Sequence, residues 1–122
     1  MVWKVIFHRD FLAEFEALSA LVQDEIAAMA LLLEEIGPTL RRPHADTMNG
    51  SRFANMKELR FDADDGVWRL VYALDPARMA ILLVAGDKSG VSSKRFYKSL
   101  IAKADARFES HLGELKLRST KK

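Results

Sequence analysis

Alternation along residues 67–74 is the sequence feature that most constrains how this chain can fold. Large apolar side chains recur there at every second position: Trp68, Leu70, Tyr72 and Leu74. Because successive side chains of a strand point to opposite faces, this segment is predicted to be a β-strand with one buried face. Strands are also predicted over 54–61 and 78–85, and the turn residues between the three segments predict an antiparallel meander.

The residues before this meander predict a strand followed by a helical hairpin. Residues 2–7 alternate and are predicted to form the strand. Asp10 is the predicted N-cap of a helix, because apolar residues then recur at steps of three and four as far as Gly37-Pro38. A break near Ser19 would divide this helix into a hairpin, which can cover one face of a small sheet.

Residues 38–53 are predicted to be a loop, and a last helix is expected from Ser92 or Ser93 to about Leu117. Its apolar side chains recur at nearly four-residue steps: Phe96, Leu100, Ala104, Phe108 and Leu112. Residues 118–122 are expected to be a frayed, flexible tail. The expected fold is therefore α+β, with an N-terminal strand and helical hairpin packed on a small antiparallel sheet and a C-terminal helix, in one domain over 1–122.

Composition excludes several classes of protein. Of the 122 residues, 49% are hydrophobic, which is enough for a buried core. The absence of cysteine excludes a disulfide framework, a thiolate zinc site and a cysteine nucleophile, and it fits a cytoplasmic protein. No signal peptide is visible and no apolar stretch approaches the roughly 20 residues that a membrane span needs, so no membrane association is expected.

The two faces of the meander are predicted to differ in chemistry. The side chains expected under the helices are Leu59, Phe61, Trp68 and Leu70. Glu58, Arg60 and Arg69 have the opposite parity and are expected on the other, more open face. Two arginines and a carboxylate can form a phosphate-binding surface there, because guanidinium groups bind phosphate in a bidentate manner. An internal salt-bridge network of Glu58 with Arg60 or Arg69 is the alternative interpretation.

Basic residues gather at the start of the last helix. Residues 57–122 carry more Lys and Arg than Asp and Glu, which favours a polyanionic partner. In the first turns of the helix, Lys94, Arg95 and Lys98 can act with the helix dipole on a bound phosphate. Tyr97 can stack on a base or transfer a proton. A core tyrosine within a solvated basic rim explains the same residues equally well.

Few other segments carry recognisable chemistry. The loop at residues 86–90 lacks the Walker spacing, which excludes nucleotide hydrolysis but keeps Lys88 as a cation close to a phosphate. The three histidines have no metal-ligand spacing, so no metal site is expected. His44 with Asp46 can form an acid/base pair, although surface and capping roles are more common for such loop residues.

Short motifs in a fixed order span nearly the whole chain. They are Gly37-Pro38 with Arg42-Pro43, Asn49-Gly50-Ser51, Asn55 to Arg60, Gly66 to Tyr72, and Asp75-Pro76. Together with the order of predicted elements, they resemble the RelE/ParE toxin superfamily, most closely its phage-derived, HigB-like branch. The resemblance implies a RelE-like fold and a type II toxin.

What this resemblance implies is a ribosome-dependent mRNA endonuclease of the cytoplasm. A helix-turn-helix antitoxin would neutralise it in a toxin–antitoxin hetero-oligomer. The implied reaction uses no metal or other cofactor: the RNA 2′-hydroxyl attacks the adjacent phosphorus and leaves a cyclic phosphate and a 5′-hydroxyl. Such a reaction needs a base, an acid for the leaving oxygen, and cations for the phosphorane.

The family pattern assigns roles residue by residue. Arg69 matches the arginine that stabilises the phosphate, Lys88 the basic residue after the last strand, and Tyr97 the tyrosine of the C-terminal segment. Relatives place two lysines where this chain has Met56 and Glu58, which makes Glu58 the candidate base. The expected RNA-contacting residues are Arg60, Lys57, Lys94, Arg95 and Lys98.

Two other functions are compatible with the same resemblance. One is a ParE-like toxin that inhibits gyrase and cleaves no RNA, and the missing lysines favour it. The other is a non-catalytic binding module from a phage-derived system, in which the sheet face holds a partner. DNA damage with intact mRNA would identify the first, and expression without a growth defect the second.

Overall fold

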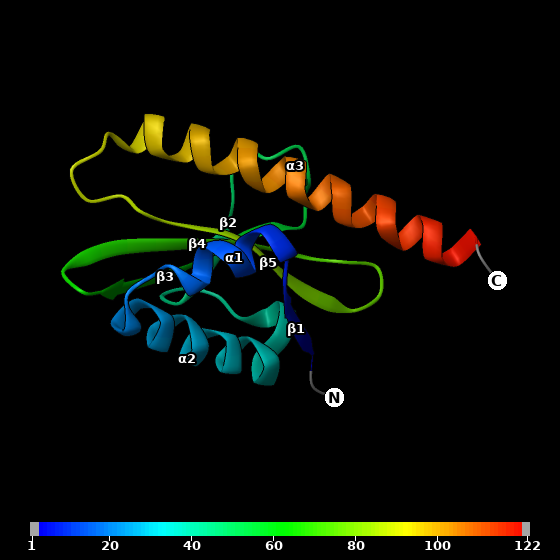
Figure 1. Ribbon diagram of the computed structural model, residues 1–122, viewed down its shortest axis with the longest axis horizontal. Helices are drawn as coiled ribbons and strands as arrows, with labels where there is room; N and C mark the ends of the chain where they lie inside the picture. The colour runs from blue at the N-terminus through cyan, green and yellow to red at the C-terminus, as the bar shows by residue number, and fades with distance from the viewer. Residues whose placement is uncertain (1–2, 121–122) are drawn as a thin grey trace.

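A computed structural model describes residues 3–120, in which helices cover both faces of a five-stranded sheet (Figure 1). The elements are β1 (Lys4–Phe7), α1 (Arg9–Glu16), α2 (Ala20–Ile36), the 3-10 turn η1 (Gly37–Thr39), β2 (Ala45–Thr47), β3 (Met56–Ala63), β4 (Gly66–Leu74), β5 (Met79–Asp87) and α3 (Ser93–Thr120). The α+β class, the hairpin and the C-terminal helix are thus confirmed.

The sheet is mixed, whereas the sequence predicted an antiparallel one. Its strand order is β1-β5-β4-β3-β2, and β1 runs parallel to β5 with Lys4 opposite Met79 and Phe7 opposite Leu82. The predicted loop at 38–53 also contains β2, a strand of three residues that pairs antiparallel with β3. This strand is too short for an alternation of side chains to be recognised. Val2, part of the predicted first strand, lies outside the described residues.

Local capping explains where the helical hairpin begins and bends. The Ser19 hydroxyl accepts a hydrogen bond from the Val22 amide at 3.3 Å, so α2 begins where the break was predicted. The prediction of Asp10 as the first N-cap was wrong. His8 caps α1 instead, because its Nδ1 accepts from the Asp10 amide at 3.1 Å and the helix already begins at Arg9.

Two apolar clusters lie on the two faces of the sheet. The cluster under α1 and α2 includes Leu59, Phe61, Leu70 and Tyr72, which confirms the parity predicted for β3 and β4. The second cluster lies under α3 and includes Met56, Val71, Ala73, Phe96 and Leu100. The expectation of an open second face was therefore wrong at Glu58 and Arg69, whose side chains are buried where α3 covers the sheet, whereas Arg60 remains partly exposed.

The ends of several elements differ from their predicted positions. β3 starts at Met56 rather than Ala54, and β5 continues through Gly86 and Asp87, which were predicted to be a loop. α3 continues through Thr120, three residues into the predicted flexible tail, while residues 121 and 122 lie outside the described range. The amino-terminal half of α3 lies along the sheet and its carboxyl end extends past it (Figure 1).

Within residues 3–120, no helix combines the length and apolarity that crossing a bilayer requires.

Candidate functional site

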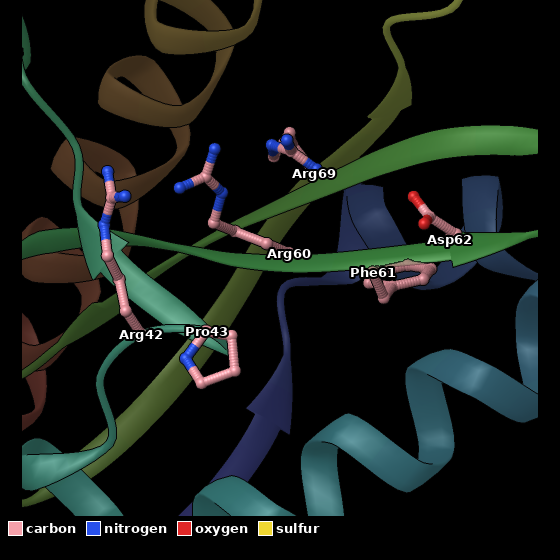
Figure 2. Close-up of a pocket in the computed structure, with 6 residues that line it drawn as sticks. All are labelled: Arg42, Pro43, Arg60, Phe61, Asp62 and Arg69. Carbon is pink, nitrogen blue, oxygen red and sulfur yellow. The ribbon is translucent and has the colours of Figure 1, made fainter.

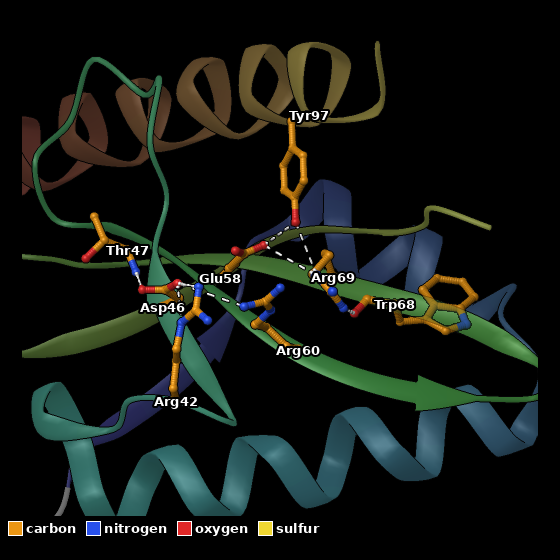
Figure 3. A network of polar contacts seen from close by, with 8 residues as sticks. All are labelled: Arg42, Asp46, Thr47, Glu58, Arg60, Trp68, Arg69 and Tyr97. Carbon is orange, nitrogen blue, oxygen red and sulfur yellow. Dashed lines mark hydrogen bonds and ion pairs between the residues drawn. The ribbon is translucent and has the colours of Figure 1, made fainter. Parts of the chain in front are cut away.

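Glu58, Arg69 and Tyr97 meet between the sheet and the amino end of α3 (Figure 3). The Tyr97 hydroxyl donates to Glu58 Oε1 at 2.9 Å and accepts from Arg69 Nε at 3.2 Å. Arg69 Nε lies 3.7 Å from Glu58 Oε1, and each of these two side chains is only 9% exposed. A carboxylate, a phenol and a guanidinium from β3, α3 and β4 therefore form one contact cluster, which we call the Glu58–Arg69–Tyr97 trio.

Sheet register brings the first two members of the trio together. β3 and β4 are antiparallel neighbours, with Glu58 opposite Val71 and Arg60 opposite Arg69. Glu58 and Arg69 are consequently diagonal neighbours on one face, within reach of long side chains. The Arg69 guanidinium also donates to the Trp68 carbonyl at 2.8 Å through Nη1, which fixes its orientation.

The third member, Tyr97, comes from the first turns of α3. Phe96 beside it is buried, and the two rings pack edge to face with centroids 5.2 Å apart. Burial raises the pKa of the Tyr97 phenol, the hydrogen bond to Glu58 raises it further, and the hydrogen bond from Arg69 partly opposes both effects. The phenol therefore keeps its proton at neutral pH and is available as a proton donor.

Lys88 lies beside the trio on the loop that follows β5. Its Nζ lies 5.9 Å from the centroid of the Tyr97 ring, within cation–π range. The Lys88 amide donates to the Val67 carbonyl at 2.8 Å, and Asp87 Oδ1 accepts from the Val67 and Ser89 amides. These bonds hold the loop against β4, so all four residues expected to be catalytic lie in one region.

Arg60 joins a second polar group that includes Arg42 and Asp46. The carboxylate of Asp46 accepts from Arg42 Nε at 2.9 Å, and the same oxygen lies 3.9 Å from Arg60 Nη1. The Arg42 hydrogen bond is the main cause that lowers the pKa of Asp46, and the Thr47 amide lowers it further. Arg42 was not among the predicted site residues. The only sign of its role in the sequence is its spacing of four residues from Asp46, within a segment predicted to be a loop.

Two clefts border these groups. One, of about 400 Å³, is lined by Arg42, Pro43, Arg60, Phe61, Asp62 and Arg69 (Figure 2). The other, of about 300 Å³, is lined by residues that include Arg42, Asp46, Glu58, Arg60 and Tyr97. Members of the trio thus face cavities large enough to admit part of a nucleotide.

Several other predicted site residues lie elsewhere. Lys57 lies on the face of the sheet opposite Arg69, where its Nζ donates to the Pro38 carbonyl at 3.1 Å. Arg95 lines a separate cleft together with Val91 and Phe96. Lys94 and Lys98 are exposed on α3 close to Tyr97. RNA contacts by these two lysines stay a prediction.

The histidines have structural contacts in this fold. His111 Nε2 lies 2.7 Å from Asp75 Oδ2, between α3 and the turn after β4, and His8 caps α1. His44 is exposed, and Asp46 hydrogen-bonds with Arg42 instead. Among residues 3–120, no group of three His, Asp or Glu side chains has the arrangement of a metal site.

The trio supplies the groups that a phosphoryl transesterification requires. A carboxylate can accept a proton, a protonated phenol can donate one, and guanidinium groups can stabilise a dianionic phosphorane. The internal salt bridge that was the alternative interpretation of Glu58 and Arg69 is also present, at 3.7 Å. The salt-bridge interpretation is therefore confirmed, and phosphate binding at the same pair of side chains stays a prediction.

Comparison with known proteins gives consistent relationships. The family of phage-derived Gp49-like proteins matches residues 13–109, a span that contains the whole trio. A candidate toxin of Mycobacterium tuberculosis, HigB3, is 53% identical over 81 residues, which cover 66% of this chain and 68% of that protein. A second candidate toxin of the same bacterium, HigB2, is 45% identical over 84 residues, or 68% of this chain and 41% of that longer protein.

A solved structure adds a likeness in fold. A mutant of the E. coli toxin RelE in the free state has a TM-score of 0.61 and 15% identity, over 88% of this chain and 98% of that chain. At this identity, the likeness concerns the fold alone. The chain therefore belongs to the family of phage-derived Gp49-like proteins, and it is a RelE-like toxin of the HigB type.

Proposed function

We propose that this toxin is a ribosome-dependent mRNA endonuclease that cleaves by transesterification. The observation that carries the proposal is the direct contact of Glu58, Arg69 and Tyr97 beside two clefts. These three side chains provide the base, the cation and the acid of the reaction from the chain itself. They also provide them although positions 56 and 58 lack the lysines that the family resemblance led us to expect.

The chemical steps follow from the contacts of the trio. Glu58 accepts the proton of the RNA 2′-hydroxyl while the O2′–P bond forms, and Arg69 stabilises the charge on the phosphorane. Tyr97 donates its proton to the 5′-oxygen as the P–O5′ bond breaks. The proton on Glu58 then passes to the Tyr97 phenolate along their 2.9 Å hydrogen bond, which restores both groups. The products are a 2′,3′-cyclic phosphate and a 5′-hydroxyl.

The remaining parts of the proposal concern the setting of this activity. The toxin relatives imply a cognate antitoxin, and we propose a helix-turn-helix protein that forms a hetero-oligomer with the toxin. Residues 1–122 act as one domain, in the cytoplasm, on mRNA in the ribosomal A site. Arg60, Lys94 and Lys98 assist with RNA contacts, and Lys88 adds positive charge beside Tyr97.

Purified protein added to translating ribosomes tests the activity. We expect mRNA cleavage within the A-site codon, with 5′-hydroxyl ends that can be ligated only after phosphorylation. Tyr97→Phe is expected to slow cleavage by about 10²- to 10⁴-fold, the usual contribution of a general acid. Tyr72→Phe is the matched control, because Tyr72 is buried on the other face of the sheet, and it should cleave as fast as the wild type.

Three results would contradict the proposal in different ways. Intact mRNA at high toxin excess would exclude the nuclease. DNA damage on expression, with mRNA left whole, would instead identify a gyrase inhibitor. Expression without a growth defect would identify a binding module that catalyses nothing.

A further inference from the structure

The wall between the two clefts consists of Arg42 and Arg60, which line both of them. In the larger cleft these two guanidinium groups are joined by Arg69, and Asp62 is the one acidic residue among the described residues that line it. Figure 2 shows Arg42 and Asp62 at opposite ends, with Arg60 and Arg69 between them. Three neighbouring guanidinium groups around a cavity favour an anionic ligand with more than one negative group.

Asp46 holds Arg42 in place without covering it. Its Oδ2 accepts from Arg42 Nε at 2.9 Å and lies 2.8 Å from Nη2, yet the Arg42 side chain is still 71% exposed. The hydrogen bond from Arg42 lowers the pKa of Asp46, so the carboxylate stays ionised and the pair persists at neutral pH. A guanidinium that is oriented beforehand and remains accessible loses little entropy when it binds a phosphate.

Strand geometry sets the spacing between the arginines. Arg60 stands directly opposite Arg69 in the β3–β4 register, and neighbouring strands lie about 4.8 Å apart. Two like charges placed opposite each other are unfavourable without an anion between them. Arg69 has the buried Glu58 as its partner, whereas Arg60 has a longer contact, of 3.9 Å, to the more exposed Asp46. Arg60 can therefore contact a phosphate next to the one held by Arg69.

We propose that Arg42 and Arg60 form a second phosphate subsite, which binds the backbone phosphate adjacent to the scissile one in a single-stranded RNA. This inference rests on the proposed function, since it takes the scissile phosphate to lie at the Glu58–Arg69–Tyr97 trio. The preferred ligand is consequently an RNA with a phosphate beside the cleaved linkage, and an RNA without that phosphate binds more weakly. Asp46 is a positioning residue of the subsite.

A binding experiment tests the subsite without any cleavage. The probe is a short fluorescein-labelled single-stranded RNA in which every 2′-hydroxyl is methylated, titrated by fluorescence anisotropy at several KCl concentrations. Arg42→Ala should weaken binding about three- to tenfold. It should also make the slope of the logarithm of the binding constant against the logarithm of the KCl concentration shallower by about 0.7, the value for one phosphate contact. Arg41→Ala is the matched control, because Arg41 is also exposed but lines neither cleft.

The same variants in the ribosome assay separate this inference from the proposed function. Arg42→Ala should raise the protein concentration needed for half-maximal cleavage and leave the rate at saturation unchanged. If the wild type does not cleave mRNA but Arg42→Ala still binds RNA more weakly than Arg41→Ala does, the phosphate contact of Arg42 stands, its place beside a scissile phosphate is overturned, and the nuclease fails. If the wild type cleaves but the two variants bind equally well, the subsite is excluded and the nuclease stands.

Replacement of individual phosphates gives an independent readout. A methylphosphonate removes the charge of one phosphate in the probe, and moving it along the RNA should identify two positions that weaken wild-type binding. With Arg42→Ala, one of these two positions should lose its effect. If replacement at every position weakened binding equally, in both the wild type and Arg42→Ala, the RNA would be held only by general attraction to the positively charged surface. That result would overturn the subsite. Arg42 is mostly exposed, so its replacement should leave the melting temperature unchanged.

Discussion

The Tyr97 hydroxyl donates a 2.9 Å hydrogen bond to Glu58 Oε1 and thereby links α3 to the central part of β3. The acceptor is a carboxylate that is itself nearly buried, so this hydrogen bond lies in a poorly solvated environment. Hydrogen bonds to charged groups are stronger than neutral ones. The contact therefore stabilises the docking of α3 as well as the arrangement of the trio.

The titration of Tyr97 should depend on Glu58. Burial and the Glu58 hydrogen bond both raise the pKa of Tyr97, so its phenolate should form above the ordinary value of about 10. Glu58→Gln removes the negative charge of the acceptor, which weakens the second cause, and should lower the pKa of Tyr97 toward that value. The phenolate absorbance in a Tyr72→Phe background measures this, because the chain has only two tyrosines. An identical titration before and after the Glu58→Gln substitution would show that the contact does not persist in solution.

Removal of Arg69 should destabilise the fold as well as the site. Arg69→Ala leaves the Glu58 carboxylate buried without its cation, and breaking such a pair costs about 3 kcal/mol or more. Urea unfolding gives the free energy. Arg60→Ala is the comparison: Arg60 is 27% exposed, its contact to Asp46 is 3.9 Å and it stands opposite Arg69. Because the weak attraction and the repulsion oppose each other, a change below about 1 kcal/mol is expected.

A double variant distinguishes the electrostatic effect of losing Arg69 from the effect of losing its packing. Glu58→Gln with Arg69→Met removes both charges and should regain most of the stability that Arg69→Ala loses, because neither partner is then left uncompensated. Equal instability of the single and the double variant would contradict the electrostatic explanation. Both should lack mRNA cleavage.

A bidentate ion pair predicts how stability changes with pH. Arg107 donates to both Glu14 oxygens, at 2.9 and 2.6 Å, and these hydrogen bonds lower the pKa of Glu14 although burial opposes them. A carboxylate with a lowered pKa adds stability above its unfolded pKa and loses it as the pH falls through its folded pKa. The wild type should therefore exceed Glu14→Gln in unfolding free energy at pH 7, and the difference should shrink below about pH 4.3.

The control for this prediction lies on the same helix. Glu16→Gln changes an exposed carboxylate of α1 and should show little pH-dependent difference from the wild type. Urea titrations at a series of pH values measure both variants. A Glu14→Gln difference that stayed constant down to about pH 3, well below the ordinary glutamate pKa, would mean that the ion pair contributes nothing to this stability.

Tyr72 offers a stabilising substitution. Its hydroxyl has no hydrogen-bond partner among residues 3–120, although the side chain is fully buried. Because a buried hydroxyl without a partner costs about 1–3 kcal/mol, Tyr72→Phe should raise the unfolding free energy by about 1 kcal/mol. Thermal and urea unfolding measure the change. A clear destabilisation would show that the hydroxyl has a partner in solution, such as a buried water molecule.

Side-chain parity was the most reliable information in the sequence. Alternation over 67–74 identified which residues of β3 and β4 share a face, and it placed Glu58 and Arg69 together correctly. What α3 does to that face was not predicted. Val71 and Ala73 have the same parity as Arg69, and these apolar neighbours were a readable sign that the face is covered.

Other parts of the site depend on contacts that a local pattern does not contain. β2 has three residues, so Asp46 could not be placed in a strand, and Arg42 could not be placed beside Arg60. The parallel pairing of β1 with β5 joins the two ends of the sheet-forming part of the chain, with Lys4 opposite Met79, and such long-range pairings leave no periodic signal. Tyr97 lies in the trio because α3 packs on this face of the sheet. The periodicity of the sequence predicted the helix but not where it packs.

Arg60 and Arg69 lie opposite each other on neighbouring strands, and this placement implies a trade-off between thermal stability and activity. Like charges opposite each other in a sheet weaken the pairing of the strands, and a neutral residue at either position would relieve that repulsion. Random variants of this toxin selected only for heat resistance should therefore tend to lose Arg60 first, since Arg69 is held by Glu58. The selected variants would keep the fold and lose affinity for polyanions.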